Sequence, residues 1–380
     1  MQKTTWLCVV LICAVLRPMQ AQERWKSEWK KFPDPVTGRP VWQITSHDSP
    51  SVAVYFERQP FTADDRYLVF GSKRSGTWQL YRADMRNGKI VRVSAKKDLS
   101  PYSFTIHPDG KSACYIHENI LYKTDVRKLK EKVWMDFNGK FSTPLRLSSS
   151  FSADARFTVM TTKTDSGVGI YRVDLEDGSL QGTLWKAGPL SHPLICPTNP
   201  DLITFVPGPD TQNDMTLPME KRARTWILNL KNGETKPFLM MPYGFRATHE
   251  SWSADGRRFF FYKKAVPGWK PVSICSIDQD GGNLREYYRH DSIKLGHGLS
   301  SQDGQWFLSD GQDPDKNPLI LINLQTGEAT FLCWPNASMN EEAGQHGHVH
   351  PTLSFSGRYA CYTSDVTGVP QVYVAPTGLK

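Results

Sequence analysis

Short turns recur along this chain at a nearly constant interval, and this repeat restricts the fold more than any other feature. Three turns, built around Asp64, Asp109 and Asp154, follow one another at intervals of 45 residues. Later turns stand at Thr198-Asn199, Asp255-Gly256, Asp303-Gly304 and Ser356-Gly357. A period of about 45 to 55 residues with one short turn per unit is typical of the blades of a β-propeller.

Each turn precedes an alternating apolar strand, and in most units a third strand and a second turn follow. Tyr67–Phe70 and Phe259–Tyr262 are two such strands, while Asn87-Gly88 and Asp177-Gly178 are two of the second turns. Asn-Gly and Asp-Gly between alternating strands are strong hairpin signals, because both central residues need a positive φ. Helix-periodic stretches are scarce. The sequence therefore predicts an all-β protein, a seven-bladed β-propeller.

The two ends of the repeat complement each other. The last unit ends with a third strand, Gln371–Ala375, and no fourth strand follows it, while Val41–Ile44 reads as the end of a unit. We expect this N-terminal strand to complete the seventh blade, which would close the ring and remove exposed sheet edges. We predict a single propeller domain over residues 22–380.

The first residues have the pattern of a secretory signal peptide, which we place at residues 1–21. Lys3 precedes an apolar run, Trp6–Leu16, and a polar break ends near Ala21. The run is too short to span a bilayer as a helix. We expect export to the periplasm, with cleavage after Ala21 and lipidation at Cys13 as the two open alternatives.

Charge and cysteine content narrow the classes of partner. The formal net charge is +8, and a positive field attracts anionic ligands such as acidic sugars. Because no Arg/Lys-rich run is interleaved with aromatic residues, we do not expect a nucleic acid partner. The five cysteines beyond the signal segment are far apart and lie mostly in strand-like runs. This spacing argues against a disulfide framework and favours small buried side chains.

One position in each unit, six residues before the turn, is predicted to lie at one mouth of the central channel. These seven slots are Arg58, Ser103, Ser148, His192, His249, His297 and His350. Hydrogen bonding at a strand end would explain a single histidine, but four in consecutive units favour a functional site. We expect Arg58 and His192 to contact the substrate.

The segment Gln345–Pro351 carries the strongest local motif. His348 and His350 are two residues apart, so in an extended chain they point to the same side. We do not expect His346 to be a ligand. Neutral imidazoles are the commonest metal ligands, and a nearby amide oxygen suits a harder divalent ion. With His297 from the neighbouring unit, these groups predict a site for Mn²⁺ or a similar cation, and His290 is the alternative to His297.

At these residues the sequence is similar to the oligogalacturonate lyases, a pectin-degrading polysaccharide lyase family built on a seven-bladed propeller. The resemblance extends from about Asp34 to Ala375, and its most specific stretch is Gln345–Asp365. The opening Asp34–Gly38 and the first unit, Tyr55–Phe70, are also similar. The family is typically cytoplasmic, whereas this chain has an apparent export signal.

The resemblance implies a reaction and a set of roles. The reaction is β-elimination of short oligogalacturonides, a carbon–oxygen lyase reaction that needs no organic cofactor. The residues that match the family's Mn²⁺ ligands are His297, Gln345, His348 and His350. The proton-abstracting histidine matches His249, and the active-site arginine matches Arg224, with Arg222 as the alternative. An unperturbed imidazole is mostly neutral at pH 7, which suits a general base.

Three other classes of protein share parts of this pattern. A non-catalytic TolB-like propeller, acting as a scaffold, would have the same turns but no reason to collect histidines at the channel. The propeller of a serine peptidase is disfavoured, because no Gly-x-Ser-x-Gly nucleophile motif is present. A lyase for a different uronic-acid glycan remains open, because a metal site recognises the carboxylate and leaves the rest of the sugar to the loops.

Overall fold

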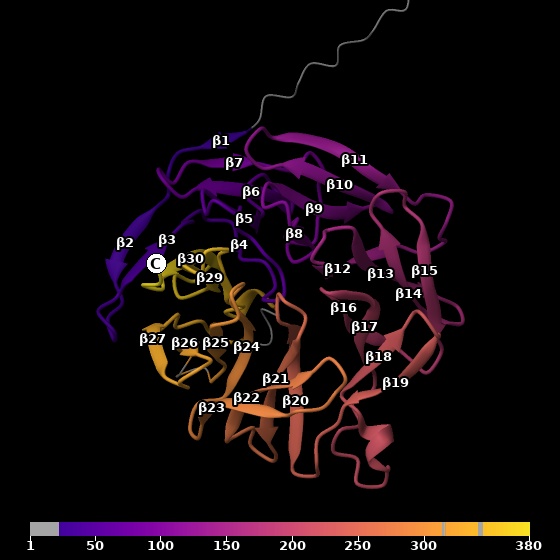
Figure 1. Ribbon diagram of the computed structural model, residues 1–380. Helices are drawn as coiled ribbons and strands as arrows, with labels where there is room; N and C mark the ends of the chain where they lie inside the picture. Colours follow the sequence, from indigo (N-terminus) through magenta and orange to yellow (C-terminus); the bar gives the residue numbers. More distant parts are fainter. Residues whose placement is uncertain (1–22, 314, 316, 341–344) are drawn as a thin grey trace, which may run out of the picture.

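The computed structural model describes residues 23–313, 315, 317–340 and 345–380, and within them seven antiparallel sheets form a ring (Figure 1). Each sheet is one blade, and its strands run outward from the channel in chain order, except that strands from the N-terminus are added at the outer edges of the first and last blades. The seven-bladed propeller predicted from the repeat is confirmed. The predicted signal peptide, residues 1–21, lies outside the described residues.

The first four blades follow the predicted units closely. Blade 1 contains β4 (Ser51–Val52), β5 (Tyr67–Ser72), β6 (Gln79–Asp84) and β7 (Ile90–Arg92). Blade 2 contains β8 (Phe104–Ile106), β9 (Ser112–His117), β10 (Ile120–Asp125) and β11 (Lys130–Asp136). Blade 3 contains β12 (Leu145–Phe151), β13 (Phe157–Thr164), β14 (Gly167–Asp174) and β15 (Leu180–Trp185). Blade 4 contains β16 (Leu190–Cys196), β17 (Asn199–Pro207), β18 (Thr225–Asn229) and β19 (Glu234–Leu239), with the short 3₁₀ helix η1 (Met219–Arg222) before β18.

The last three blades continue the same order. Blade 5 contains β20 (Phe245–Trp252), β21 (Arg258–Ala265), β22 (Val272–Asp278) and β23 (Arg285–His290). Blade 6 contains β24 (Leu295–Ser300), β25 (Trp306–Gly311), β26 (Leu319–Asn323) and β27 (Ala329–Cys333). Blade 7 contains β28 (Thr352–Leu353), β29 (Tyr359–Ser364) and β30 (Gln371–Pro376).

The N-terminal segment closes the ring at two places. β3 (Pro40–Gln43) pairs with β30, so that Trp42 lies opposite Val374, and β2 (Lys30–Pro33) adds a further strand outside it. β1 (Arg24–Trp25) pairs with β7 at the outer edge of blade 1. The expected closing strand is therefore present. The chain before it crosses the boundary between blades 7 and 1 and joins both blades, which the sequence did not predict.

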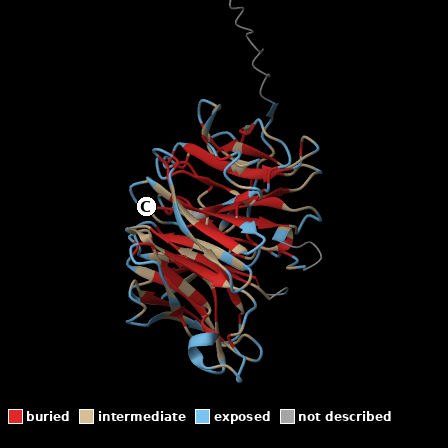
Figure 2. Ribbon diagram, turned by 90° about the vertical axis from the view of Figure 1, so that its right-hand side faces the viewer, coloured by how far each residue is buried: buried red, intermediate tan, exposed pale blue. Residues whose placement is uncertain are grey.

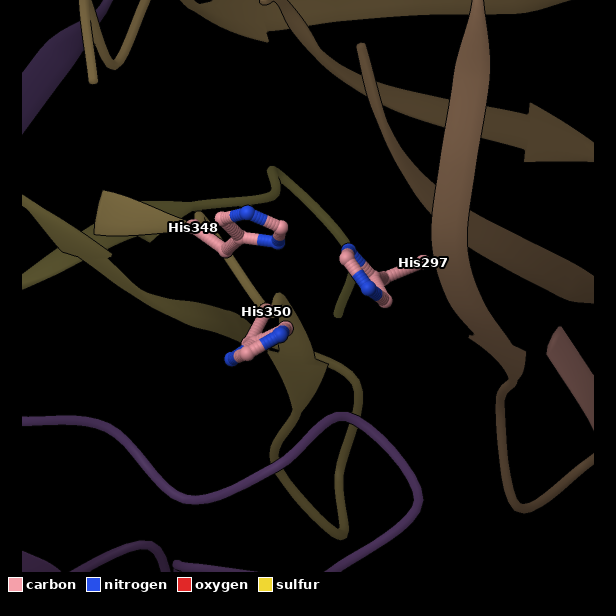
Figure 3. Close-up of side chains that lie close together, drawn as sticks. All are labelled: His297, His348 and His350. Atoms are coloured by element: carbon pink, nitrogen blue, oxygen red, sulfur yellow. The ribbon is translucent and has the colours of Figure 1, made fainter. Parts of the chain in front are cut away.

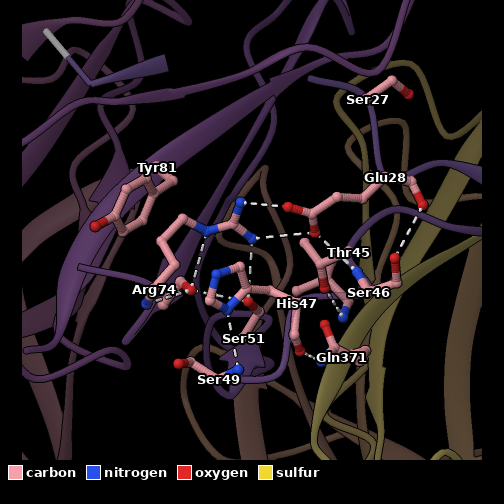
Figure 4. A network of polar contacts seen from close by, with 12 residues as sticks. Ser27, Glu28, Thr45, Ser46, His47, Ser49, Ser51, Arg74, Tyr81 and Gln371 are labelled. Carbon is pink, nitrogen blue, oxygen red and sulfur yellow. Dashed lines mark hydrogen bonds and ion pairs between the residues drawn. The ribbon is translucent and has the colours of Figure 1, made fainter. Parts of the chain in front are cut away.

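A polar network, which we call the seam network, holds this boundary together (Figure 4). It consists of Glu28, Ser51, Ser72 and Arg74. The Arg74 side chain is fully buried, and its Nη1 donates to Glu28 Oε1 at 2.8 Å. Its Nε donates to Ser72 Oγ at 3.2 Å, and its Nη2 to Ser51 Oγ at 3.4 Å. Each guanidinium nitrogen therefore has a partner, as a buried charge requires.

The repeated aspartates close the first turn of their blades. In blade 1 the Thr62 hydroxyl donates to Asp64 Oδ1 at 2.6 Å, and in blade 5 the Ser253 hydroxyl donates to Asp255 Oδ1 at 2.6 Å. The same carboxylate oxygens accept backbone N–H groups two residues further on. Such short side-chain bonds to the local backbone explain why aspartate marks these turns in the sequence.

The apolar core lies between neighbouring blades, where the strands are buried and the loops are exposed (Figure 2). Between blades 5 and 6, for example, Phe260 and Ile274 pack with Leu295 and Ile320. The five cysteines within the described residues are free and buried, in agreement with the interpretation as small apolar side chains. Among the described residues, no helix is long and apolar enough to cross a membrane.

Candidate metal centre

The inner strands are irregular at the histidine slots. The pairing of β16 with β17 shifts between Ser191 and Leu194, and that of β20 with β21 shifts between Thr248 and Ser251. Backbone φ is positive at His192 (49°), His249 (54°) and His350 (44°). Left-handed φ is uncommon outside glycine, and such conformations and bulges cluster at functional sites, where they redirect side chains.

Three histidine rings meet at the channel mouth (Figure 3). The ring centroids of His297 and His350 are 4.4 Å apart, and His348 lies 5.7 Å from His297 and 5.6 Å from His350. One ring nitrogen from each residue lies within 4.8 Å of the others. His297 is 2% exposed and His350 is 0% exposed. We call this group the histidine cluster.

The histidine cluster fits a divalent cation. Neither ring nitrogen of His350 has a hydrogen-bond partner in the part of the chain that the structure describes, although the side chain is fully buried. Burying an unsatisfied polar group is unfavourable, and a metal ion would satisfy it. Imidazole nitrogens are suitable ligands for several first-row divalent metals.

A buried carboxylate supports one of the three rings. Asp310 Oδ2 lies 3.0 Å from His297 Nδ1, and Asp310 Oδ1 accepts the His297 backbone N–H at 2.6 Å. A metal-binding histidine commonly has such a partner on its second nitrogen, which leaves Nε2 for the ion. Burial raises the pKa of the Asp310 carboxyl to about 7, and the charge of a bound cation would favour the ionised form.

A turn at Tyr55–Arg58 inserts two aromatic rings into the channel. The Arg58 backbone N–H donates to the Tyr55 carbonyl at 2.9 Å. The Tyr55 ring lies 4.7 Å from the ring of His350, and the fully buried Phe56 ring lies 5.3 Å from His297. These rings shield the histidine cluster from water on this side, and sequence reasoning gave them no role.

His249 lies against the histidine cluster without a polar partner on Nδ1 among the described residues. Its ring centroid is 4.4 Å from that of His297 and 5.8 Å from that of Phe56. Burial, and next the neighbouring His297, hold the pKa of His249 well below its usual value. The imidazole is therefore neutral at pH 7 and can accept a proton.

Arg224 reaches this region and Arg222 does not. Arg224 Nε donates to Glu250 Oε1 at 2.7 Å, and Glu250 directly follows His249 on β20. Arg222 is 1% exposed, and its Nη1 donates to the Gln212 carbonyl at 2.7 Å. The structure thus favours the predicted Arg224 over the alternative Arg222, which has a structural contact of its own.

The two predicted substrate-binding residues line one cavity together with Tyr55, and each already has a polar partner within the protein. Arg58 donates through Nη2 to the Leu147 carbonyl at 2.8 Å, and burial lowers its pKa to about 10. His192 Nδ1 lies 2.7 Å from Glu57 Oε1. Burial by itself would lower the pKa of His192, but the Glu57 carboxylate raises it above the usual value.

Three other residues close in sequence to the predicted ligands, His290, His346 and Gln345, differ in where they lie. His290 lies on β23, the outermost strand of blade 5, where its Nδ1 accepts the Ile293 backbone N–H at 3.0 Å, so His297 and not His290 joins the cluster. The ring of His346 stacks on Tyr102, and its Nδ1 lies 2.6 Å from the Tyr102 hydroxyl. Gln345 is exposed, and its role as a ligand stays a prediction.

A cavity of about 650 Å³ opens beside the histidine cluster, and its walls include Tyr55, Arg58 and His192. Sequence reasoning missed three carboxylates of this region: Glu57, which lines the cavity, Glu250, which accepts from Arg224, and Asp310, which lies against His297. Asp310 carried a usable signal, because it is a charged residue near the end of the largely apolar strand β25. Glu57 and Glu250 stand directly beside slot residues, but sequence alone does not show that they turn toward the channel.

Comparisons with known proteins agree with this arrangement, although no family model matches the chain. The oligogalacturonide lyase of Pectobacterium atrosepticum is 23% identical, over 90% of this chain and 95% of that protein. The oligogalacturonate lyase of Dickeya dadantii is 22% identical over the same shares. The resemblance to the oligogalacturonate lyase family is confirmed.

Solved oligogalacturonate lyases share the fold of this chain. One, in complex with manganese, superposes with a TM-score of 0.78 at 21% identity, covering 93% of this chain and 97% of the other. The enzyme from Vibrio parahaemolyticus superposes with a TM-score of 0.77, also at 21% identity, covering 93% of this chain and 98% of the other. By contrast, the TolB protein of Desulfotalea psychrophila is 32% identical over 81 residues, which is 21% of this chain.

Proposed function

We propose that this protein is an oligogalacturonate lyase, a carbon–oxygen lyase that cleaves short oligogalacturonides by metal-assisted β-elimination. The observation that carries the proposal is the buried histidine cluster, in which both nitrogens of His350 lack a partner among the described residues. A non-catalytic scaffold has no use for such a group. The full-length similarity to oligogalacturonate lyases, one of them solved with manganese, supports the same function.

His297, His348 and His350 would hold a divalent cation, Mn²⁺ or a similar ion, with Gln345 as a further ligand. The bound ion supplies a Lewis acid, which neutralises the substrate carboxylate and favours negative charge at the adjacent carbon. The support for His297 is geometric, because Asp310 bonds to its Nδ1 and fixes the direction of the ring.

His249 is the general base in this proposal. The C5 hydrogen of a uronide lies next to the carboxylate, and a base must remove it while that carboxylate is neutralised. The ring of His249 contacts His297, and its Nδ1 has no partner within the described ranges. It can therefore accept a proton beside the site where the carboxylate would bind.

In this proposal Arg224 binds an anionic group of the substrate and neutralises its negative charge. Its guanidinium is bonded to the buried Glu250, which holds it near His249 and leaves Nη1 for an anionic ligand. Arg58 and His192, on the wall of the adjacent cavity, contact the remainder of the oligosaccharide. We also propose that the protein is exported to the periplasm, on the pattern of residues 1–21.

The test uses the full chain with digalacturonate and trigalacturonate in the presence of Mn²⁺. We expect the ultraviolet absorbance of a carbon–carbon double bond conjugated to a carboxylate to increase, and a chelator to stop the increase until Mn²⁺ is restored. Oligoglucuronate serves as the matched substrate control. Product from oligoglucuronate alone would indicate a lyase for another uronic-acid glycan, and tight metal binding without any product would indicate a scaffold.

A further inference from the structure

Two neighbouring histidine slots share a backbone conformation but differ in their polar surroundings. His192 in blade 4 and His249 in blade 5 both have left-handed φ at a shift in strand pairing. Glu57 lies 2.7 Å from His192 Nδ1, whereas the described residues offer no partner to His249 Nδ1. The histidine at this slot therefore has a carboxylate partner in blade 4, whereas the one in blade 5 has no partner on Nδ1 among the described residues.

Glu57 fixes the state of the His192 ring. The Glu57 side chain is 7% exposed, so its bond to the imidazole is a charge-assisted hydrogen bond with little competition from water. The carboxylate keeps a hydrogen on Nδ1, which leaves Nε2 as the nitrogen that faces a ligand. It also raises the pKa of His192 in spite of burial, so the ring can carry a second proton on Nε2.

His192 is placed where a ligand can reach it. Its side chain is 23% exposed and forms part of the wall of the 650 Å³ cavity. The Tyr55 ring contacts both groups, at 5.9 Å from the ring of His192 and 4.7 Å from the ring of His350. A uronide whose carboxylate binds at the histidine cluster would therefore extend its neighbouring sugar into the cavity beside His192.

We propose that His192 is the proton donor to the departing glycosidic oxygen, and that Glu57 is the residue that positions it. This inference rests on the proposed lyase function. His249 takes the C5 proton, and the C5–H electron pair forms the C4–C5 double bond. The C4–O bond breaks with its electron pair on oxygen, which takes the Nε2 proton of His192. Afterwards His249 releases a proton to water and His192 regains one, so no water is consumed.

Two substrates with different leaving groups test this assignment. Digalacturonate releases galacturonate through its anomeric oxygen, which needs a proton, whereas a galacturonate with an aryl ether at C4 releases an aryloxide that does not. For His192→Gln we expect kcat on digalacturonate to fall by ~10²–10⁴-fold, the usual range for a lost general acid. On the aryl ether we expect a much smaller fall. Glu57→Gln should reduce kcat on digalacturonate with little change in KM.

The controls separate this proposal from the proposed function. His249→Ala should lose activity on both substrates, and His192→Gln should bind Mn²⁺ as tightly as the wild type, which shows an intact site. Equal losses of His192→Gln on both substrates would overturn the assignment and leave His192 as a binding residue. If the wild-type protein released no unsaturated product from either substrate, the lyase function itself would be wrong.

Discussion

The seam network and the histidine cluster are both buried and polar, yet they are built in opposite ways. In the seam network each nitrogen of the Arg74 guanidinium has a hydrogen-bond partner. In the histidine cluster, His350 has two nitrogens without a partner among the described residues, and its backbone φ is left-handed. The first arrangement stabilises the fold, whereas the second is complete only when a ligand binds.

The largest expected effect separates catalysis from binding within the channel mouth. His249→Ala should reduce kcat by at least ~10²–10⁴-fold, because it removes the general base. Mn²⁺ affinity should stay close to that of the wild type, since His249 is not a predicted ligand. Calorimetric titration with Mn²⁺ and the product-absorbance assay measure the two quantities. Near-normal turnover with bound metal would remove His249 from the role of base.

The next effect tests whether the histidine cluster is completed by a metal. Mn²⁺ at 100 times its Kd should stabilise the wild-type protein by ~2.7 kcal/mol. His350→Ala should abolish this gain, which thermal unfolding with and without Mn²⁺ measures. The matched control is His346→Ala, because His346 stacks on Tyr102 outside the cluster. A His350→Ala protein that Mn²⁺ still stabilises fully would contradict the assignment.

Substitutions in the seam network should have the opposite effect: they should lower the stability of the fold and leave the catalytic activity unchanged. Glu28→Ala leaves the buried Arg74 charge without its carboxylate, and loss of one partner of a buried pair costs about 3–5 kcal/mol. Urea unfolding measures this change. The double variant Glu28→Ala with Arg74→Met should recover part of the loss. Turnover per folded molecule should not change in either variant, and a specific loss of kcat would link the seam to the site.

A smaller effect tests the support of His297. Asp310→Asn keeps a carbonyl oxygen for the His297 backbone N–H but removes the carboxylate charge. Loss of such a supporting group typically lowers metal affinity ~10–100-fold. Mn²⁺ titration of the folded variant measures it. Unchanged affinity would show that Asp310 serves only the backbone of β24.

The number of blades could be predicted from the sequence because it depends on local chemistry. Asp64 and Asp255 each close a turn with a hydroxyl two residues away, and such turns leave a readable pattern. The histidine slots were predictable for the same reason, since each stands at a fixed distance from its turn. The convergence of the His297 and His350 rings followed from the propeller fold and their slot positions. That of the His348 ring followed from its position two residues before His350.

The supporting groups could not be predicted, because they depend on contacts across the closed ring. Glu57 and His192 are 135 residues apart and come from blades 1 and 4. The rings of Tyr55 and Phe56 contact the histidine cluster, and neither residue stands at the periodic slot position. β1 has two residues, too few for an alternating pattern, and its pairing with β7 depends on how the N-terminal segment crosses the seam.

The pairing of β3 with β30 affects how the chain folds while it is being synthesised. β3 leaves the ribosome well before its partner β30, because the strands of the intervening blades lie between them in the chain. Until β30 is made, the circle stays open, and the apolar sides of blades 1 and 7 have no cover. Long-range pairing of this kind slows folding, and it prolongs the lifetime of aggregation-prone intermediates that expose apolar surface. We therefore expect the nascent chain to need protection by chaperones until β3 has paired with β30.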